Sequence, residues 1–177
     1  MIRLLKRLAQ GFRREDGTAS IEFVMAVPVL LTVFMASFES GLLMTRSIML
    51  EQSVDITMRE LRLGHYPMPN AALLKTEICK RTVIFNKCEE SIMIEMTRIN
   101  TATWTLPQTD VVCVDREEEI QPVTALQIGQ QNDVMLVRVC VMQDAIFPTS
   151  EFGLQLATDA LGGYALVAVS AFVTEPS

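Results

Sequence analysis

The chain has 177 residues, enough for one domain with an added segment, and half of its residues are hydrophobic. Only 6% are aromatic, so the hydrophobic content comes from aliphatic residues and 11 methionines. The formal net charge of −6 argues against binding to nucleic acid, because the phosphate backbone attracts basic proteins.

A basic leader precedes an uncharged apolar run at the N-terminus. Five basic residues lie ahead of this run, and residues 23–38 carry no charge. With its continuation past Glu39 to Met44, the run reaches the roughly 20 residues that a helix needs to cross a bilayer. Because basic residues remain on the cytoplasmic side of a membrane, we expect the leader in the cytoplasm and the rest of the chain beyond the membrane.

Gly17, Glu22 and Phe23 form a pattern that is typical of a prepilin peptidase site. A secretory signal peptide has its small-residue cleavage site after the apolar region, whereas Gly17 lies before it. We therefore predict cleavage between Gly17 and Thr18, which removes the leader (residues 1–17) and leaves the membrane helix on a mature chain that begins with the free amine of Thr18. The mature chain is more acidic than the full chain, because the leader is mainly basic.

The same residues resemble the start of the TadE-like family, whose members are minor pseudopilins of the Flp, or tight-adherence, type IVb pilus. The likeness is carried by Gly17, by Glu22-Phe23 five residues later, and by Pro28 with the leucine-rich residues that follow it. A C-terminal strand that runs into Glu175-Pro176 resembles the usual ending of the family. Major Flp pilins are very short after processing, so the large region beyond the helix indicates a minor component of the pilus.

The resemblance implies a place in the bacterial inner membrane, with one membrane pass, a cytoplasmic N-terminus and a periplasmic or extracellular head that can be incorporated in the pilus. It implies four kinds of partner: the prepilin peptidase, other pilin and pseudopilin subunits, the inner-membrane platform that assembles the pilus, and membrane lipid. It also implies that Glu22 and Phe23 serve in peptidase recognition, and that Glu22 pairs with the Thr18 amine of a neighbouring subunit, which sets the register between subunits. The alternative is that Glu22 is an ordinary interfacial acid of a single-pass anchor.

The apolar run continues into an amphipathic helix. Pro28 removes a donor from the helical hydrogen-bond ladder, so we expect a kink near residues 24–28. Residues 45–63 carry apolar side chains at helical spacing, and we expect the helix to stop near Gly64, ahead of two prolines. The apolar stripe consists of Leu50, Val54, Met58 and Leu61. The predicted units of the mature chain are the transmembrane helix (residues 18–44), its continuation (45–63) and the exported head (64–177).

The head is predicted to contain one helix and a β-sheet. Asn70 is a suitable N-cap for a helix over residues 71–84. Residues 92–97 follow a period of two, which indicates a half-buried strand. Further strands are expected over residues 111–114, 134–142 and 164–173, the last two in central positions, and a loop or short helix over residues 147–156. The fold class is therefore α+β and pilin-like: a long N-terminal transmembrane helix that continues into a small head with an antiparallel β-sheet and a second helix.

The four cysteines, Cys79, Cys88, Cys113 and Cys140, all lie in the exported part. An even number of cysteines in an oxidising compartment predicts two disulfides, for which three connectivities exist. We favour Cys79 with Cys88, which joins the end of the second helix to its loop, and Cys113 with Cys140, which joins two strands. In a chain-entropy treatment these bonds contribute about 2.7 and about 3.6 kcal/mol. A zinc site is the rival interpretation, but the close ligand pairs that are typical of zinc are absent.

No constellation of residues in the sequence indicates catalysis or metal binding. His65 is the only histidine and lies next to a turn, where we expect it to be exposed. The acidic run at residues 115–119 lacks the alternating ligands and the glycine of a calcium loop, and no glycine-rich phosphate loop occurs. We therefore predict a structural protein with no enzyme activity, no metal and no cofactor. The alternative is a single-pass, membrane-anchored extracytoplasmic binding protein whose leader is never removed.

Overall fold

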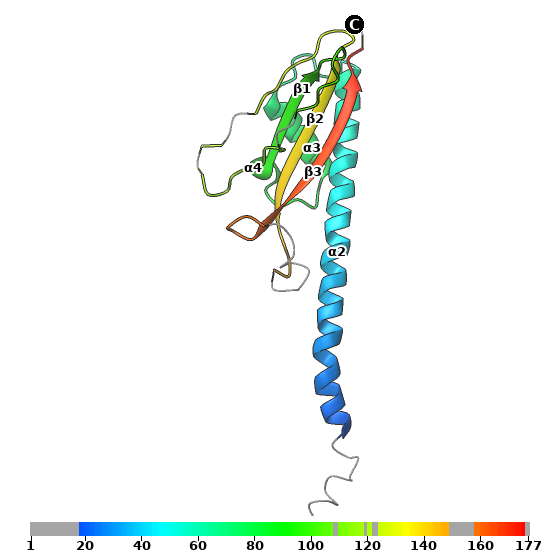
Figure 1. The fold of residues 1–177 in the computed structure, drawn as a ribbon, viewed down its shortest axis with the longest axis vertical. Coiled ribbons are helices and arrows are strands. Elements are labelled where there is room, and N and C mark those ends of the chain that lie inside the picture. The colour runs from blue at the N-terminus through cyan, green and yellow to red at the C-terminus, as the bar shows by residue number, and fades with distance from the viewer. Residues whose placement is uncertain (1–17, 108–109, 119, 122–123, 149–157, 176–177) are drawn as a thin grey trace, which may run out of the picture.

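The structure, a computed structural model, describes residues 18–107, 110–118, 120–121, 124–148 and 158–175. A long helix, α2 (Thr18–Arg62), runs the length of the molecule, and the other elements form a head along its C-terminal half (Figure 1). These elements are the helices α3 (Ala71–Arg81) and α4 (Cys88–Ser91) and the strands β1 (Ile92–Ile99), β2 (Val134–Asp144) and β3 (Gly163–Val173). The predicted α+β arrangement, a long apolar helix followed by a small head with an antiparallel sheet, is confirmed.

α2 is one helix through both its apolar first part and the part that carries the head. Pro28 lies inside α2, and the kink expected there stays a prediction. As predicted, the helix stops just before Gly64. The backbone N–H of Gly64 donates to the carbonyl of Leu61, and that of His65 donates to the carbonyl of Glu60, each at 3.1 Å. These two bonds form a Schellman motif, which requires the positive φ of 74° that a glycine adopts without steric cost.

α3 starts as predicted and ends early. The side-chain oxygen of Asn70 accepts a hydrogen bond from the backbone N–H of Leu73 (2.8 Å), so Asn70 is the N-cap. The helix ends at Arg81, before the predicted end at residue 84. Thr82 leaves the helical conformation, and its hydroxyl and its backbone N–H bond to carbonyls of the last turn. The short helix α4 follows, and the sequence analysis did not predict it.

The three strands form an antiparallel sheet in the order β1-β2-β3. The central position expected for residues 134–142 is confirmed, but that expected for residues 164–173 is wrong. Within the described residues β3 pairs only with β2, apart from one isolated bridge at its start. Its strongly apolar sequence does not reflect two covered faces, because Leu166 is buried whereas Val167 and Val169 are 41% and 57% exposed.

The strand expected over residues 111–114 is absent, and these residues form a loop on the outer face of the sheet. Val114 packs there against Met93, Cys140 and Met142, which point outward from β1 and β2. A segment that lies on the face of a sheet cannot join its hydrogen-bond ladder. The apolar residues of 111–114 therefore shield the outer face of the sheet from water. The predicted loop or short helix over residues 147–156 lies largely outside the described residues.

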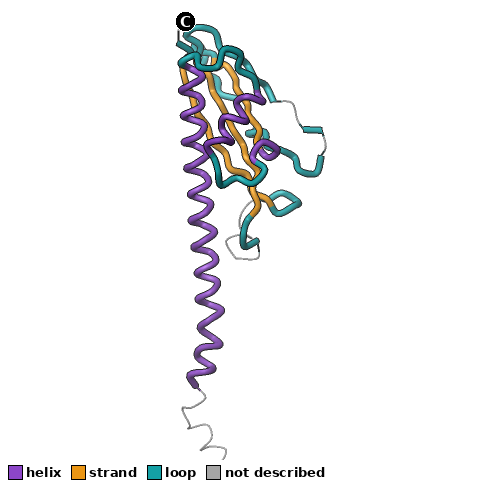
Figure 2. The backbone as a smooth tube through the Cα atoms, turned by 180° about the vertical axis from the view of Figure 1, so that it is seen from behind, coloured by secondary structure: helices purple, strands orange, loops and turns teal. Residues whose placement is uncertain are grey.

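The main core lies between the inner face of the sheet and two helices. α2 packs along β3, and α3 packs against α2 and β1. Figure 2 shows α3 in front of the strands, on the same side as α2. The predicted stripe on α2 is confirmed, since Leu50, Val54 and Met58 are buried and Leu61 is partly buried against the same core. The head is therefore built onto α2 and shares its core with it.

Candidate functional site

The first half of α2 stands clear of the head (Figure 1). Every side chain described from residue 19 to residue 38 is exposed or only partly covered, and Glu39 is the first buried residue. About 20 residues at 1.5 Å per residue span about 30 Å, which is the thickness of the hydrocarbon core of a bilayer. α2 is thus long and apolar enough to cross a membrane, and the part free of the head has the required length.

The predicted processing and register residues lie at the far end of this free part. Gly17 is outside the described residues, and Thr18 is the first residue of α2. Glu22 and Phe23 follow on the first turns, and Phe23 is 69% exposed. Within the described residues Glu22 makes no hydrogen bond or ion pair. The structure therefore does not bring these residues into contact with the head, and their predicted roles depend on molecules other than this chain.

The free part of α2 ends at a buried carboxylate. Glu39 has no exposed surface, although it lies one residue beyond the uncharged apolar run. Its two carboxylate oxygens accept hydrogen bonds from the backbone N–H groups of Ile146 (3.0 and 3.2 Å) and Phe147 (3.0 Å). Bonds to a carboxylate are stronger than bonds between neutral groups. Glu39 therefore ties the segment after β2 to the helix at the point where the helix leaves the head.

Arg46 makes a second polar contact on the same face of α2. It is buried, its guanidinium donates to the carbonyl of Asp144 (3.0 Å) and to the hydroxyl of Tyr164, and it lies over the Tyr164 ring at 5.9 Å from the centroid. A cation over an aromatic face is attracted by the ring quadrupole. Arg46 thereby binds the end of β2 and the start of β3 at once.

Arg116 joins the end of β2 to the segment just before β3. Its guanidinium donates to Asp144 (2.6 Å) and makes two bonds to Asp159 (2.7 and 2.8 Å). These hydrogen bonds lower the pKa of Asp159 and raise the pKa of Arg116, so both groups stay charged over a wide pH range. The guanidinium lies against the backbone of Gly163, where a Cβ would collide with it. A larger residue at this position would therefore require the guanidinium to move from its place against the backbone.

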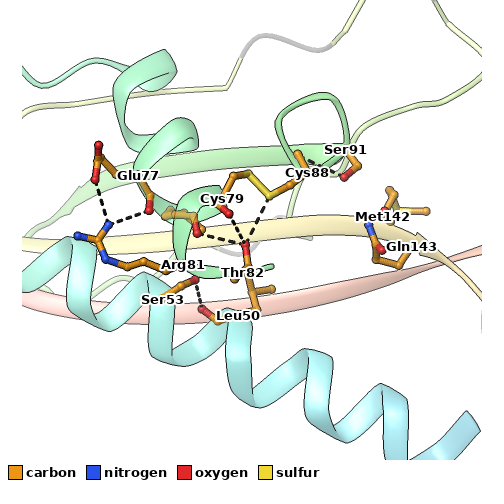
Figure 3. Close-up of a disulfide and its surroundings, with 11 residues drawn as sticks. Leu50, Ser53, Glu77, Cys79, Arg81, Thr82, Cys88, Ser91, Met142 and Gln143 are labelled. Atoms are coloured by element: carbon orange, nitrogen blue, oxygen red, sulfur yellow. Dashed lines mark hydrogen bonds and ion pairs between the residues drawn. A yellow bond between two sulfur atoms is a disulfide. The ribbon is translucent and has the colours of Figure 1, made fainter. Parts of the chain in front are cut away.

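Two disulfides close the head. Cys79 in α3 is bonded to Cys88 at the start of α4, with a Cα–Cα distance of 5.7 Å, and Figure 3 shows this bond beside Thr82. Cys113 in the loop on the outer face is bonded to Cys140 in β2, with a Cα–Cα distance of 5.2 Å. These are the two pairs that the sequence analysis favours. One detail differs from the prediction: Cys113 lies in a loop, whereas the prediction placed it in a strand.

The contacts of Glu39, Arg46 and Arg116 were missed by the sequence analysis, which treated Glu39 only as the edge of the apolar run. One signal was present: Glu39, Arg46 and Leu50 recur at spacings of seven and four residues and therefore share one helix face. Two charged residues in the stripe that faces the core indicate buried charges. Their partners lie after β2 for Glu39 and in β2 and β3 for Arg46, and they could not be inferred from that spacing.

Metal and histidine chemistry finds no support in the part of the chain that the structure describes. In that part no group of three or more His, Cys, Asp or Glu side chains is placed to hold a metal ion. His65 is exposed in the turn after α2, as predicted.

Fold and site define a class of protein in which one apolar helix, long enough to cross a membrane, carries a small disulfide-bonded head. Residues 17–59 match the model of the family described as TadE-like protein, so the resemblance stated from the sequence is confirmed. The match begins at Gly17 and includes both the free part of α2 and most of the part beneath the head. It points to a component related to the Tad pilus, in a family with a structural role. No curated protein and no solved structure matches the chain.

Glu39→Ala should loosen the segment after β2, because the N–H groups of Ile146 and Phe147 lose their acceptor. A donor left unpaired away from water costs about 1–3 kcal/mol. We expect faster amide hydrogen exchange at these two residues and a lower free energy of unfolding, measured on the full chain in detergent. Glu51→Ala on the exposed face of α2 is the matched control and should change neither. Unchanged exchange at residues 146 and 147 would contradict the assigned role of Glu39.

The ion pair between Arg116 and Asp159 should make the stability of the head depend on pH. Because the pKa of Asp159 is lowered in the folded state, its contribution is complete above the unfolded value of about 4 and is lost as the pH falls through the folded value. Asp159→Asn removes the charge but keeps an oxygen for the N–H groups of Leu161 and Gly163. The variant should be about 1 kcal/mol less stable than the wild type at pH 7, as measured by urea unfolding.

This difference in unfolding free energy should shrink below about pH 4 and disappear at lower pH. Asp110→Asn, at an exposed position, should show no comparable difference at either pH. A difference between the wild type and Asp159→Asn that stays constant down to pH 2 to 3 would show that the charge of Asp159 is not what stabilises the head.

Proposed function

We propose that this chain is a minor pseudopilin, a structural or assembly component of a Flp/Tad adhesive pilus, with no catalytic activity. One observation carries the proposal: the residues that match the TadE-like family coincide with a single helix, half of which is free and apolar while the other half forms part of the core of the head. A protein of this shape can stand in a membrane and can also pack its helix among those of other subunits. Its partners are other pilin and pseudopilin subunits and the inner-membrane assembly platform.

The proposed membrane-spanning part is residues 19–38, which is shorter than the predicted residues 18–44. The reason is that Leu43 already packs against the core of the head, and Arg46 is buried beneath it. With the basic leader in the cytoplasm, the head lies on the periplasmic side of the inner membrane. An oxidising compartment there suits the two disulfides.

Cleavage by a prepilin peptidase between Gly17 and Thr18 is the second part of the proposal. The cut falls at the start of α2, so it removes the leader and leaves the whole helix intact. The exposed positions of Glu22 and Phe23 on the first turns support their role in recognition, because a peptidase can reach both without moving the head.

The proposed role of Glu22 in register depends on the amine that cleavage creates at Thr18. The carboxylate has no partner within the described chain and lies at the start of an apolar segment, where an unpaired charge costs about 2.5–3.5 kcal/mol if drawn to bilayer depth. Within one chain Thr18 and Glu22 are four residues apart, a spacing at which helix neighbours meet. An ion pair inside one chain is therefore the rival that an experiment has to exclude.

Gly17→Leu should leave the precursor uncut, because a bulky side chain at the scissile bond does not fit a peptidase that accepts glycine. N-terminal sequencing of the protein from cells should give Thr18 for the wild type and Met1 for the variant. Gly11→Leu, a glycine in the leader away from the cut, is the control and should be processed normally. A wild-type chain that still begins at Met1 in membranes would favour the unprocessed, membrane-anchored binding protein.

Glu22→Ala should abolish association with other pilus subunits while leaving the head folded, since Glu22 has no contact with the head. The measurement is co-purification of processed protein with other subunits and a count of surface fibres. Glu22→Gln keeps the shape without the charge and should fail equally if an ion pair between subunits is needed. Processed Glu22→Ala protein that associates at the wild-type level would leave Glu22 as an interfacial acid or as the partner of its own Thr18 amine.

A further inference from the structure

The segment after β2 reaches down beside α2 to the point where the helix leaves the head. Its residues Ile146 and Phe147, here called the foot, donate their backbone N–H groups to Glu39. The Phe147 ring meets the Phe38 ring edge to face, with 6.0 Å between the centroids. Phe38 in turn stacks on Phe34 at 6.4 Å. The foot is thus fixed to α2 by polar and aromatic contacts at one level of the helix.

That level coincides with the end of the proposed membrane span. The 30 Å or so covered by residues 19–38 match the hydrocarbon core of a bilayer, so Phe38 lies at its outer boundary. Glu39, one residue further, has its charge paired with the foot and hidden from the surroundings. The foot therefore lies at the same depth as the boundary between lipid tails and headgroups.

The composition and exposure of the foot suit that boundary. Ile146 is 48% exposed, and so is Phe38, which contacts Phe147; both are large apolar residues. Interfacial helices bury faces that carry Trp, Phe and Leu about 5–10 Å into the boundary between headgroups and acyl chains. Asp144, with its side chain 71% exposed, precedes the foot and is held on the water side by Arg116. No basic residue occurs among residues 144–148, and the neighbouring Arg116 is paired with Asp144 and Asp159, so we expect the contact with lipid to be apolar.

We propose that the foot, together with Phe38, inserts into the outer interfacial layer of the bilayer that α2 crosses, so that the head has a second contact with phospholipid. This inference rests on the proposed span of residues 19–38. With α2 as the only attachment the head could turn and tilt with the helix. With the foot in the interface, one side of the head always faces the membrane, and its height above the lipid is fixed.

The test uses the full chain in zwitterionic phosphatidylcholine nanodiscs, with one tryptophan as a depth probe. Trp104, the only tryptophan, is changed to Phe, and a tryptophan is then introduced as Phe147→Trp, Leu30→Trp or Val169→Trp. Leu30 lies within the span, and Val169 is an exposed residue of β3 in the upper head. Lipids brominated near the headgroup or in mid-chain quench tryptophan at shallow or deep positions.

We expect Phe147→Trp to emit at shorter wavelength than Val169→Trp and to lose more intensity with shallow than with deep bromines. Leu30→Trp should show the reverse preference, and Val169→Trp should lose no intensity. High salt should not change the quenching of Phe147→Trp, because the contact is apolar. Ile146→Trp, at an exposed position, provides a second probe that does not disturb the contact with Phe38 and should be quenched in the same way.

Three results would overturn the proposal. If Leu30→Trp is quenched but both foot variants behave like Val169→Trp, the span is correct and the foot stays in water. If Leu30→Trp is not quenched, the span itself is wrong, and the foot has no boundary to occupy. If the foot variants emit at short wavelength without quenching by bromines, and only at a high ratio of protein to lipid, a second copy of the chain covers the foot in place of lipid.

Discussion

The continuity of α2 is the constraint on which the rest of the structure depends. A helix satisfies its backbone hydrogen bonds internally, so it can pass from lipid into a protein core without leaving polar groups unpaired. In residues 19–38 apolar side chains point in all directions, whereas in residues 39–62 one face is buried against the sheet and the other is exposed. The head cannot move independently of the membrane helix, because the continuation of that helix is part of its core.

Two charged residues of α2 fix the position of the sheet along the helix. Apolar packing alone tolerates shifts and substitutions that keep volume and pattern, but a buried charge without its partner is strongly unfavourable. Glu39 and Arg46 both lie on the buried face. Glu39 bonds to the segment that follows β2, and Arg46 bonds to the last residue of β2 and to Tyr164 at the start of β3. A slide of the sheet by one helical turn would leave both side chains unpaired. The two contacts therefore select one register between helix and sheet, and they do so next to the point where the helix leaves the head.

Features that depend on neighbouring residues could be predicted from the sequence: the cap at Asn70, the stop at Gly64 and the strand over residues 92–97 with its period of two. Features that depend on distant residues could not. Glu39 bonds to Ile146, which is 107 positions away. Residues 111–114 have the composition of a strand, but they form a loop that covers the outer face of the sheet. In the candidate site, Gly17 and Glu22 stand out through a local pattern. Their roles stay predictions, because the peptidase or the neighbouring subunit that would engage them is not part of the chain.

The apolar surface of residues 19–38 limits where the chain can reside. In water this stretch would keep its side chains exposed, at a cost of about 25 cal/mol for each Å² of apolar surface. Lipid removes this cost, and so does a bundle of similar helices from other subunits. In both surroundings Glu22 is the only charged side chain of the stretch, and an ionised carboxylate among apolar groups needs a cation nearby. Cleavage ahead of Thr18 would create an amine at this end of the helix. The step that releases the leader would therefore also supply the cation that Glu22 requires.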